Sequence, residues 1–351
     1  MIGDVREVAE KILSELGRVL VGWEEEIKLM LAALLSNGHV LLEGVPGVAK
    51  TTAVKGLARL LGLGGLEVEI DGAPFKGLSR VQCTPDLMPS DITGSLVFNP
   101  AELKFEPRFG PIFAYILLAD EINRAIPRTQ SALLQAMQER EVTIGDRTYQ
   151  LEDRRRGKFF FVLATQNPVE QEGTYPLPEA QLDRFLMRIL VGYPRNLEEE
   201  KAILRLHSMR LTEPVLELEP IVEPEWVVRA QNVVAKRVEV PEETLEYVTR
   251  LVRFTRPEAF EPMRDLLTLG ASPRAGIFLL RAAKAHAAMR GSETATPSDV
   301  DAVSFAVLNH RLIPNPRKLV ELRLSGAGFT SQHEVAKKAL GVASKAAREA
   351  L

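Results

Sequence analysis

The chain has 351 residues, roughly the length of two domains, and its 44 Lys and Arg nearly balance 47 Asp and Glu to leave a net charge of −3. This balance argues against nucleic acid as an obligate partner, because phosphate binding usually leaves a basic footprint. The single cysteine excludes a disulfide scaffold, and the longest apolar run, Ile112 to Ala119, is far shorter than the ~20 residues of a membrane span.

Helical and strand patterns alternate through the first 194 residues. Apolar residues recur at helical spacing in some segments, and short continuous apolar runs lie between those segments. Runs of that kind are typical of parallel strands that are buried on both faces. The expected helices span 5–20, 24–36 and 51–61, and the expected strands span 40–42, 66–70, 115–119 and 159–164. This alternation predicts an α/β fold with a parallel sheet covered by helices.

Two segments interrupt the alternation and are predicted to be β-hairpin insertions. The first, about 95–108, turns at Asn99-Pro100, and the second, about 142–151, turns at Gly145-Asp146. The basic run from Arg154 to Lys158 follows the second hairpin. A basic run beside a hairpin is usually solvated surface, which is the expectation here; contact with nucleic acid or with an acidic partner is the alternative.

Strand patterns disappear after Pro194, so we expect a domain boundary there. Five helices are predicted next, at 197–211, 223–237, 241–254, 273–290 and 297–309, and a last amphipathic helix begins near Ser331. The expected organisation is therefore a core over 1–194, an all-helical domain over 195–312 and a C-terminal extension, also helical, over 313–351.

The stretch from Gly44 to Thr51 has the composition and the position of a P-loop. It lies between an expected strand and an expected helix, where backbone N–H groups can hold phosphate oxygens. Lys50 would reach the β- and γ-phosphates, and the Thr51 hydroxyl would ligate Mg²⁺. Ala49 stands where a glycine is usual, and we expect a near-helical backbone there with binding retained. The predicted nucleotide-binding residues of this loop are Gly44, Val45, Pro46, Gly47, Val48, Ala49, Lys50, Thr51 and Thr52.

Two adjacent carboxylates, Asp120 and Glu121, end an apolar strand. This placement costs free energy unless a cation or a substrate compensates the charge. Asp120 suits the Mg²⁺ shell, and Glu121 suits polarisation of the water that attacks the γ-phosphate. The strand at 159–164 leads to Asn167, whose amide would hold the water or the γ-phosphate. Together with the P-loop, these residues predict nucleotide hydrolysis.

Long motifs give the chain a family resemblance. They read GVPGVAKT at 44–51, LLADEINRA at 117–125, QSALLQAMQEREVTI at 130–144, LATQNPVEQEGTYPLPEAQLDRF at 163–185 and SPRA at 272–275. With these motifs the sequence resembles the MoxR family of AAA+ ATPases over about residues 15–312. The resemblance implies a P-loop NTPase core of the αβα type with a C-terminal all-helical lid, and it implies ATP and Mg²⁺ as cofactors. The P-loop of that family commonly has alanine where Ala49 stands.

The resemblance also assigns roles to residues outside the P-loop. It implies that Asn167 is the sensor-1 residue, that Arg184 is the finger reaching a neighbour's γ-phosphate, and that Arg274 is sensor 2 on the lid. Val21 and Gly22 would pack on the adenine. Guanidinium groups suit an anionic, dispersed transition state, and a finger supplied by a neighbour makes turnover depend on assembly.

By this resemblance the chain is expected to hydrolyse ATP with Mg²⁺ as a homo-oligomeric ring, a hexamer, and to remodel, mature or activate a protein client. Such clients often carry a von Willebrand factor A domain or are metal-dependent enzymes, and the two hairpins are expected to deliver the work. A nucleic-acid-stimulated motor is one alternative, and a slow nucleotide-gated binding scaffold is another. With one cysteine and no signal-peptide pattern, the expected location is the cytoplasm.

Overall fold

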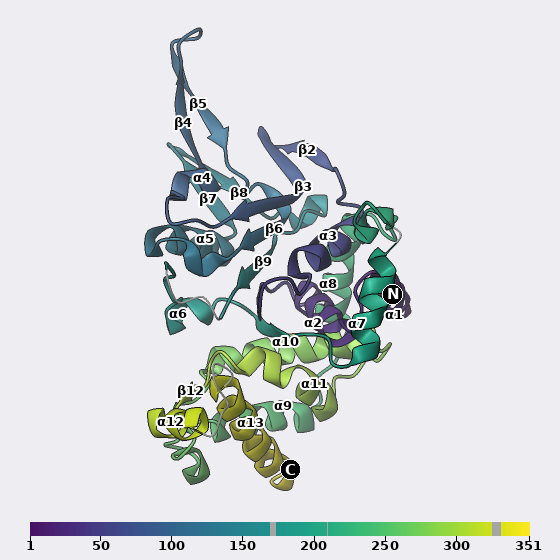
Figure 1. The fold of residues 1–351 in the computed structure, drawn as a ribbon, viewed down its shortest axis with the longest axis vertical. Coiled ribbons are helices and arrows are strands. Elements are labelled where there is room, and N and C mark those ends of the chain that lie inside the picture. The colour runs from purple at the N-terminus through teal and green to yellow at the C-terminus, as the bar shows by residue number, and fades with distance from the viewer. Residues whose placement is uncertain (169–172, 209, 325–330) are drawn as a thin grey trace.

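A six-stranded sheet forms the centre of the computed structural model, which describes residues 1–168, 173–208, 210–324 and 331–351 (Figure 1). Its strand order is β10-β1-β9-β6-β3-β2, and every pairing is parallel except that of β2 with β3. β1 and β6 are buried at every position, as central parallel strands require. The strands span Val40–Gly44 (β1), Glu67–Ile70 (β2), Ala73–Gln82 (β3), Ala114–Asp120 (β6), Phe161–Gln166 (β9) and Met187–Val191 (β10). The predicted α/β fold with a parallel sheet is confirmed.

The segment at 66–70 is not the central strand that the sequence predicts. β2 alternates exposed and half-buried residues and forms the antiparallel edge of the sheet, joined to β3 by a turn in which Asp71 and Gly72 both have positive φ. The prediction is wrong because the two-residue alternation of β2 indicates one solvated face. β3 was not predicted, since Pro74 and Gly77 interrupt its pattern, and neither was β10.

Helices lie on both sides of the sheet (Figure 1). α1, α2 and α3 lie on one side, and α5 lies on the other. Their bounds are Ile2–Gly17 (α1), Glu24–Leu35 (α2), Lys50–Leu60 (α3), Pro89–Thr93 (α4), Pro127–Glu139 (α5) and Glu179–Leu182 (α6). α1 has a fully buried stripe of Val5, Ile12 and Leu16 at helical spacing, so one face of it belongs to the core.

Two β-hairpins occupy the segments that break the alternation. The first, β4 (Gly94–Asn99) with β5 (Lys104–Phe109), stands away from the body of the molecule (Figure 1). The second, β7 (Glu141–Ile144) with β8 (Arg147–Gln150), is shorter and lies against it. The first hairpin carries exposed apolar side chains, which are Leu96, Val97, Phe98, Leu103 and Phe105.

Among the described residues after Pro194, the regular elements are helices, apart from a small ribbon of β11 (Leu267–Leu269) and β12 (Ile313–Pro314). The long helices of this part of the chain span Leu197–His207 (α7), Glu225–Arg237 (α8), Glu242–Phe254 (α9), Pro273–Met289 (α10), Pro297–Leu308 (α11), Pro316–Leu324 (α12) and Ser331–Glu349 (α13). α8 packs on α2, whereas α13 packs on α9 and α11, and α10 contacts both groups (Figure 1). Within the described residues, no helix is long and apolar enough to cross a membrane.

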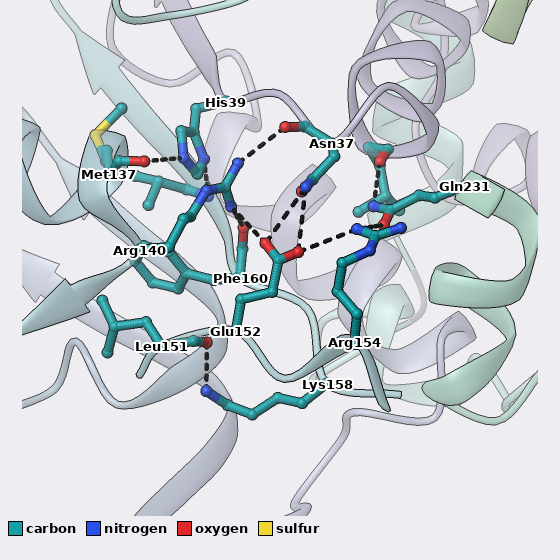
Figure 2. A network of polar contacts seen from close by, with 12 residues as sticks. Asn37, His39, Met137, Arg140, Leu151, Glu152, Arg154, Lys158, Phe160 and Gln231 are labelled. Carbon is teal, nitrogen blue, oxygen red and sulfur yellow. Dashed lines mark hydrogen bonds and ion pairs between the residues drawn. The ribbon is translucent and has the colours of Figure 1, made fainter. Parts of the chain in front are cut away.

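The base of the second hairpin is tied to both neighbouring layers through Glu152 (Figure 2). Its carboxylate lies 3.0 Å from Arg154 Nη1 and 3.5 Å from Arg140 Nη1, and it accepts from Asn37 Nδ2, just beyond α2, at 3.3 Å. Arg154 also donates to Gln231 Oε1 on α8 at 2.9 Å. The hairpin, the end of α2 and α8 therefore share one polar network.

The basic run that follows this hairpin is only partly solvated. Arg154 and Arg156 are exposed, as predicted, although each also forms an ion pair within the chain. Lys158 is fully buried, so the prediction is wrong for this residue. Its ammonium donates to the Leu151 carbonyl (Figure 2). It also lies 3.4 Å from the centroid of the Phe75 ring, and these two contacts replace part of its hydration. Burial lowers the pKa of Lys158 to about 7.

A buried polar cluster joins the last helix to the strand that precedes the P-loop. Glu43 on β1 lies 2.8 Å from His333 Nε2 on α13 and 3.5 Å from Arg188 Nη1 on β10. Arg188 Nε in turn donates to Asn309 Oδ1 at 2.5 Å. Burial acts to raise the pKa of Glu43, but the hydrogen bond with His333 and the charge of Arg188 leave it below its ordinary value. α13 is therefore anchored one residue before Gly44.

We expect Lys158 to make the stability of the fold rise with pH between about 7 and 10. Its folded-state pKa lies below the ordinary 10.5, because burial outweighs the attraction of nearby carboxylates, so in this window the unfolded chain holds a proton that the folded chain lacks. The difference in unfolding free energy between the wild type and Lys158→Met should therefore change by about 1 kcal/mol per pH unit in favour of the wild type as the pH rises. Urea unfolding of both proteins across this range measures the difference, and a constant difference would contradict the expectation.

Candidate nucleotide-binding site

The loop between β1 and α3 forms the centre of the site. β1 ends at Gly44, where a side chain has no room, because a Cβ would lie 2.3 Å from the carbonyl oxygen of Val191 on β10. α3 begins at Lys50, so the N–H groups of its first turn face the loop and can donate to an anion. The Lys50 ammonium donates to the carbonyls of Gly44 (2.5 Å) and Val45 (3.0 Å). Burial lowers the pKa of Lys50 despite the attraction of Asp120.

Ala49 adopts a left-handed backbone conformation, with φ 63° and ψ 21°. The sequence predicts a near-helical backbone at this position, and that prediction is wrong. The loop must reverse into α3 directly before Lys50, and the turn needs a positive φ at this residue. A Cβ makes this conformation cost about 1 kcal/mol, which explains why glycine is usual here. Gly47 in the same loop also has a positive φ, 81°.

Asp120 and Glu121 lie at the end of β6, on the same side of the sheet as the P-loop. Thr165 of β9 bridges them: its hydroxyl donates to Asp120 Oδ1 at 2.5 Å and accepts the Glu121 N–H at 2.9 Å. The other oxygen of Asp120, Oδ2, accepts from Thr51 Oγ1 at 3.4 Å. Hydroxyl and carboxylate oxygens are ligands that Mg²⁺ prefers, so the predicted metal ligands, Thr51 and Asp120, fit a magnesium ion.

Two site residues on β3 were missed by sequence reasoning. Arg80 Nη2 lies 2.6 Å from Asp120 Oδ2, and Gln82 Nε2 donates to Glu121 Oε2 at 2.9 Å. Arg124 Nε lies 3.4 Å from the same Glu121 oxygen. Arg80 and Gln82 could have been found from their two-residue spacing, which places both side chains on one face of a strand. Because β3 itself was not predicted, this spacing carried no meaning in the sequence.

A cavity of about 430 Å³ is lined by the predicted P-loop residues from Pro46 to Thr52, but not by Gly44 and Val45. Asn167 is buried in its wall, directly after β9, and its carbonyl accepts from Asn123 Nδ2 at 3.4 Å. The rest of the lining comes from the P-loop and from the ends of β6 and β9: Pro46, Gly47, Val48, Ala49, Lys50, Thr51, Thr52, Asp120, Glu121, Thr165 and Gln166. The cavity therefore combines N–H donors, a lysine, two carboxylates and an amide, which is the chemistry of a bound triphosphate and its metal.

A second cavity of about 380 Å³ adjoins the first, and Gly47, Val48 and Ala49 line both. Val21 and Gly22, predicted to pack on adenine, line this second cavity. Its remaining apolar walls come from the segment before α2, from the end of β10 and from α7, and they include Val19, Leu20, Trp23, Val191, Tyr193, Ile203 and Leu206. An apolar slot beside a phosphate site suits a purine base.

Comparison with known proteins decides the family. Residues 39–187 match the model of the ATPase family associated with various cellular activities (AAA), and residues 263–321 match the AAA lid domain. The chain is 44% identical over 307 residues to chaperone MoxR1 of Mycobacterium tuberculosis, covering 87% of this chain and 75% of the relative. It is 43% identical over 318 residues to the uncharacterized protein YeaC of Bacillus subtilis, covering 91% of each. The chain belongs to the MoxR family of AAA+ ATPases.

A solved structure supports the same assignment. The crystal structure of a protein from Cytophaga hutchinsonii, provisionally described as an ATPase, matches with a TM-score of 0.79 and 38% identity, covering 96% of this chain and 95% of that one. The AAA core with its C-terminal lid, expected from the sequence, is thereby confirmed. The MoxR-family fold is thus established for almost the whole chain.

The two arginines that the MoxR resemblance singles out lie away from both cavities. Arg184 and Arg274 instead line a third cavity, of about 320 Å³, together with His39. Arg274 Nη1 lies 3.3 Å from Asp183 Oδ2. The cause is topological, because Arg184 precedes β10 whereas the P-loop follows the parallel strand β1, so the two lie at opposite edges of the sheet. A strand of five residues is about 17 Å long, which keeps Arg184 from the P-loop of its own chain.

Replacing Ala49 with glycine should stabilise the nucleotide-free protein by about 0.5–1 kcal/mol, because glycine adopts a positive φ without a Cβ penalty. Ala58→Gly, in the buried interior of α3, serves as the control and should destabilise by at least about 1 kcal/mol. Thermal unfolding followed by circular dichroism measures both shifts. If A49G lowered the melting temperature as A58G does, the left-handed conformation of Ala49 would not be the source of strain.

Proposed function

We propose that this MoxR-family chain is a Mg²⁺-dependent ATPase that acts as a homo-oligomeric ring. The observation that carries the proposal is the placement of its charged groups on two opposite edges of the sheet. The P-loop, Asp120 and Glu121 share one edge, and Arg184 and Arg274 share the other. Two chains could pack so that the carboxyl ends of the strands in one chain face the amino ends of the strands in the next. One phosphoryl-transfer site would then form between them, with the arginines of one chain on the phosphates bound by the other. We take six chains as the ring size.

The chemistry at one edge follows from the residues present. Lys50 and the first-turn N–H groups of α3 would hold the triphosphate, and Thr51 with Asp120 would hold Mg²⁺, which supplies positive charge to the phosphate oxygens. Glu121 would accept a proton from the attacking water while the water oxygen forms a bond to the γ-phosphorus. The bond from that phosphorus to the bridging oxygen breaks, and ADP leaves with the electron pair. Asn167 would hold the water or the γ-phosphate.

The base would occupy the adjoining apolar cavity, with Val21 and Gly22 against the adenine. That cavity has walls from the segment before α2 and from α7, which lie more than 170 residues apart in the chain. A bound purine would therefore join the N-terminal segment to the first helix after Pro194. Loss of the base after hydrolysis would release that connection, which gives the nucleotide a way to move α7.

A protein client is the partner we propose for the ring, in line with the name chaperone that the relative MoxR1 carries. The β4–β5 hairpin would contact it, because this hairpin stands away from the body and carries exposed Phe98 and Phe105 (Figure 1). Clients with a von Willebrand factor A domain are the class that the family resemblance suggests. The location we propose is the cytoplasm.

Activity should depend on assembly through Arg184. Specific ATPase activity of the wild type should rise with protein concentration, and Arg184→Ala should lose at least about tenfold while still binding ATP. Arg155→Ala, which removes an exposed arginine that lines neither the two nucleotide cavities nor the cavity of Arg184, is the matched control and should keep the wild-type rate. A flat, low rate shared by the wild type and R184A would favour the slow nucleotide-gated scaffold instead.

Glu121→Gln tests the other half of the composite site. Removing the group that accepts the proton should lower turnover by about 100-fold or more, with ATP binding retained. Mixing E121Q with R184A should then restore activity, because an interface between them can combine the intact Glu121 of one chain with the intact Arg184 of the other. An inactive mixture that still forms mixed rings would show that the two residues do not serve one shared site.

A further inference from the structure

Two side chains of β3 contact both carboxylates of the site. In the register of the sheet, Gln82 lies beside Asp120 and Arg80 lies beside Leu118. Because Arg80 and Gln82 are two residues apart on one strand, their side chains leave the same face. The end of β3 therefore presents a cation and an amide to Asp120 and Glu121.

Arg80 occupies the oxygen of Asp120 that faces the P-loop. Its Nη2 and Nε lie 2.6 Å and 3.2 Å from Asp120 Oδ2, the oxygen that also accepts from Thr51 Oγ1. The second oxygen, Oδ1, is already taken by the hydroxyl of Thr165. A magnesium ion shared by Thr51 and Asp120 would need Oδ2, and in this structure the guanidinium group of Arg80 lies on it.

The physical consequence is competition between two cations. A nearly buried carboxylate is costly to leave unpaired, and in this structure Arg80 neutralises Asp120. A guanidinium and Mg²⁺ on one oxygen repel each other strongly at such short range. The Arg80 side chain is 51% exposed, so it can leave Asp120 for solvent, whereas Asp120 is only 11% exposed and stays in place.

We propose that Arg80 is a tethered counter-ion that holds the metal-binding oxygen of Asp120 when no metal is bound and must leave it before Mg²⁺ binds. The inference rests on the proposed function and names a residue that competes with the metal for Asp120. Arg80 Nη2 also donates to Gln82 Oε1 at 2.9 Å, and Gln82 in turn holds Glu121. Departure of Arg80 therefore removes one of the contacts that fix Gln82. Binding of the metal would in this way loosen the hydrogen bond that Gln82 donates to Glu121, the water-polarising carboxylate.

The test measures binding of Mn²⁺ alone, without nucleotide, from the loss of the free-ion electron paramagnetic resonance signal. Arg80→Ala should bind Mn²⁺ at least about tenfold more tightly than the wild type, because one competing charge is removed. Arg80→Gln should do the same while keeping a polar side chain, which guards against misfolding of the alanine variant. Lys76→Ala, which removes an equal charge from the same strand but pairs with Glu67, is the matched control and should change the affinity less than twofold.

The two signs of the result separate the possibilities. Mn²⁺ binding that is unchanged or weaker in both R80A and R80Q would overturn the proposal, since Arg80 would then support the site instead of competing for it. Asp120→Asn should abolish the tight binding of R80A; if it does not, the ion is bound elsewhere and the proposal fails. A repeat with the slowly hydrolysed analogue ATPγS separates failure of the role proposed for Arg80 from failure of the proposed ATPase function. A sample of ATPγS without protein gives the Mn²⁺ bound by the nucleotide alone. If neither the wild type nor any variant binds Mn²⁺ beyond that amount, the proposed ATPase function fails as well.

Discussion

The parallel direction of the central strands is the constraint on which the site depends. It sends every residue that follows a strand to one edge of the sheet and every residue that precedes a strand to the other. Asp120 ends a strand, and Glu121, Asn167 and the P-loop follow strands, whereas Arg184 and His39 precede them. If hydrolysis needs both groups, as we propose, the site would have to form between chains, and dependence on assembly would follow from the topology of the sheet.

The same edge carries a problem of charge. Two carboxylates side by side are unfavourable in a partly buried place, and the chain compensates them with neighbours that can be exchanged. Thr165 stays on Asp120 as a fixed hydroxyl, while Arg80 and Gln82 are longer side chains from β3. Both carboxylates thus have polar or charged partners within the chain, so a bound nucleotide and its metal would replace these partners.

Sequence reasoning found the parts of this site that are contiguous in the chain. Gly44 to Thr51 and the pair Asp120-Glu121 are recognisable because one short segment holds each, and the apolar strands before them are fully buried. Arg80 was missed because its role depends on a strand whose own pattern is broken by proline and glycine. Lys158 was misread because only the tertiary structure supplies the Phe75 ring and the carbonyl that receive its ammonium group.

The cluster of Glu43, Arg188 and His333 gives the carboxyl end of the chain a part in the site. The match to the lid family ends at residue 321, yet α13 beyond it supplies His333 to the residue that directly precedes Gly44. A chain trimmed at that limit would leave Glu43 without its hydrogen bond to His333, with Arg188 as its remaining ion-pair partner in a place closed to water. A tag, a truncation or a binding protein that displaces α13 would therefore change the contacts of Glu43, the residue that directly precedes the P-loop.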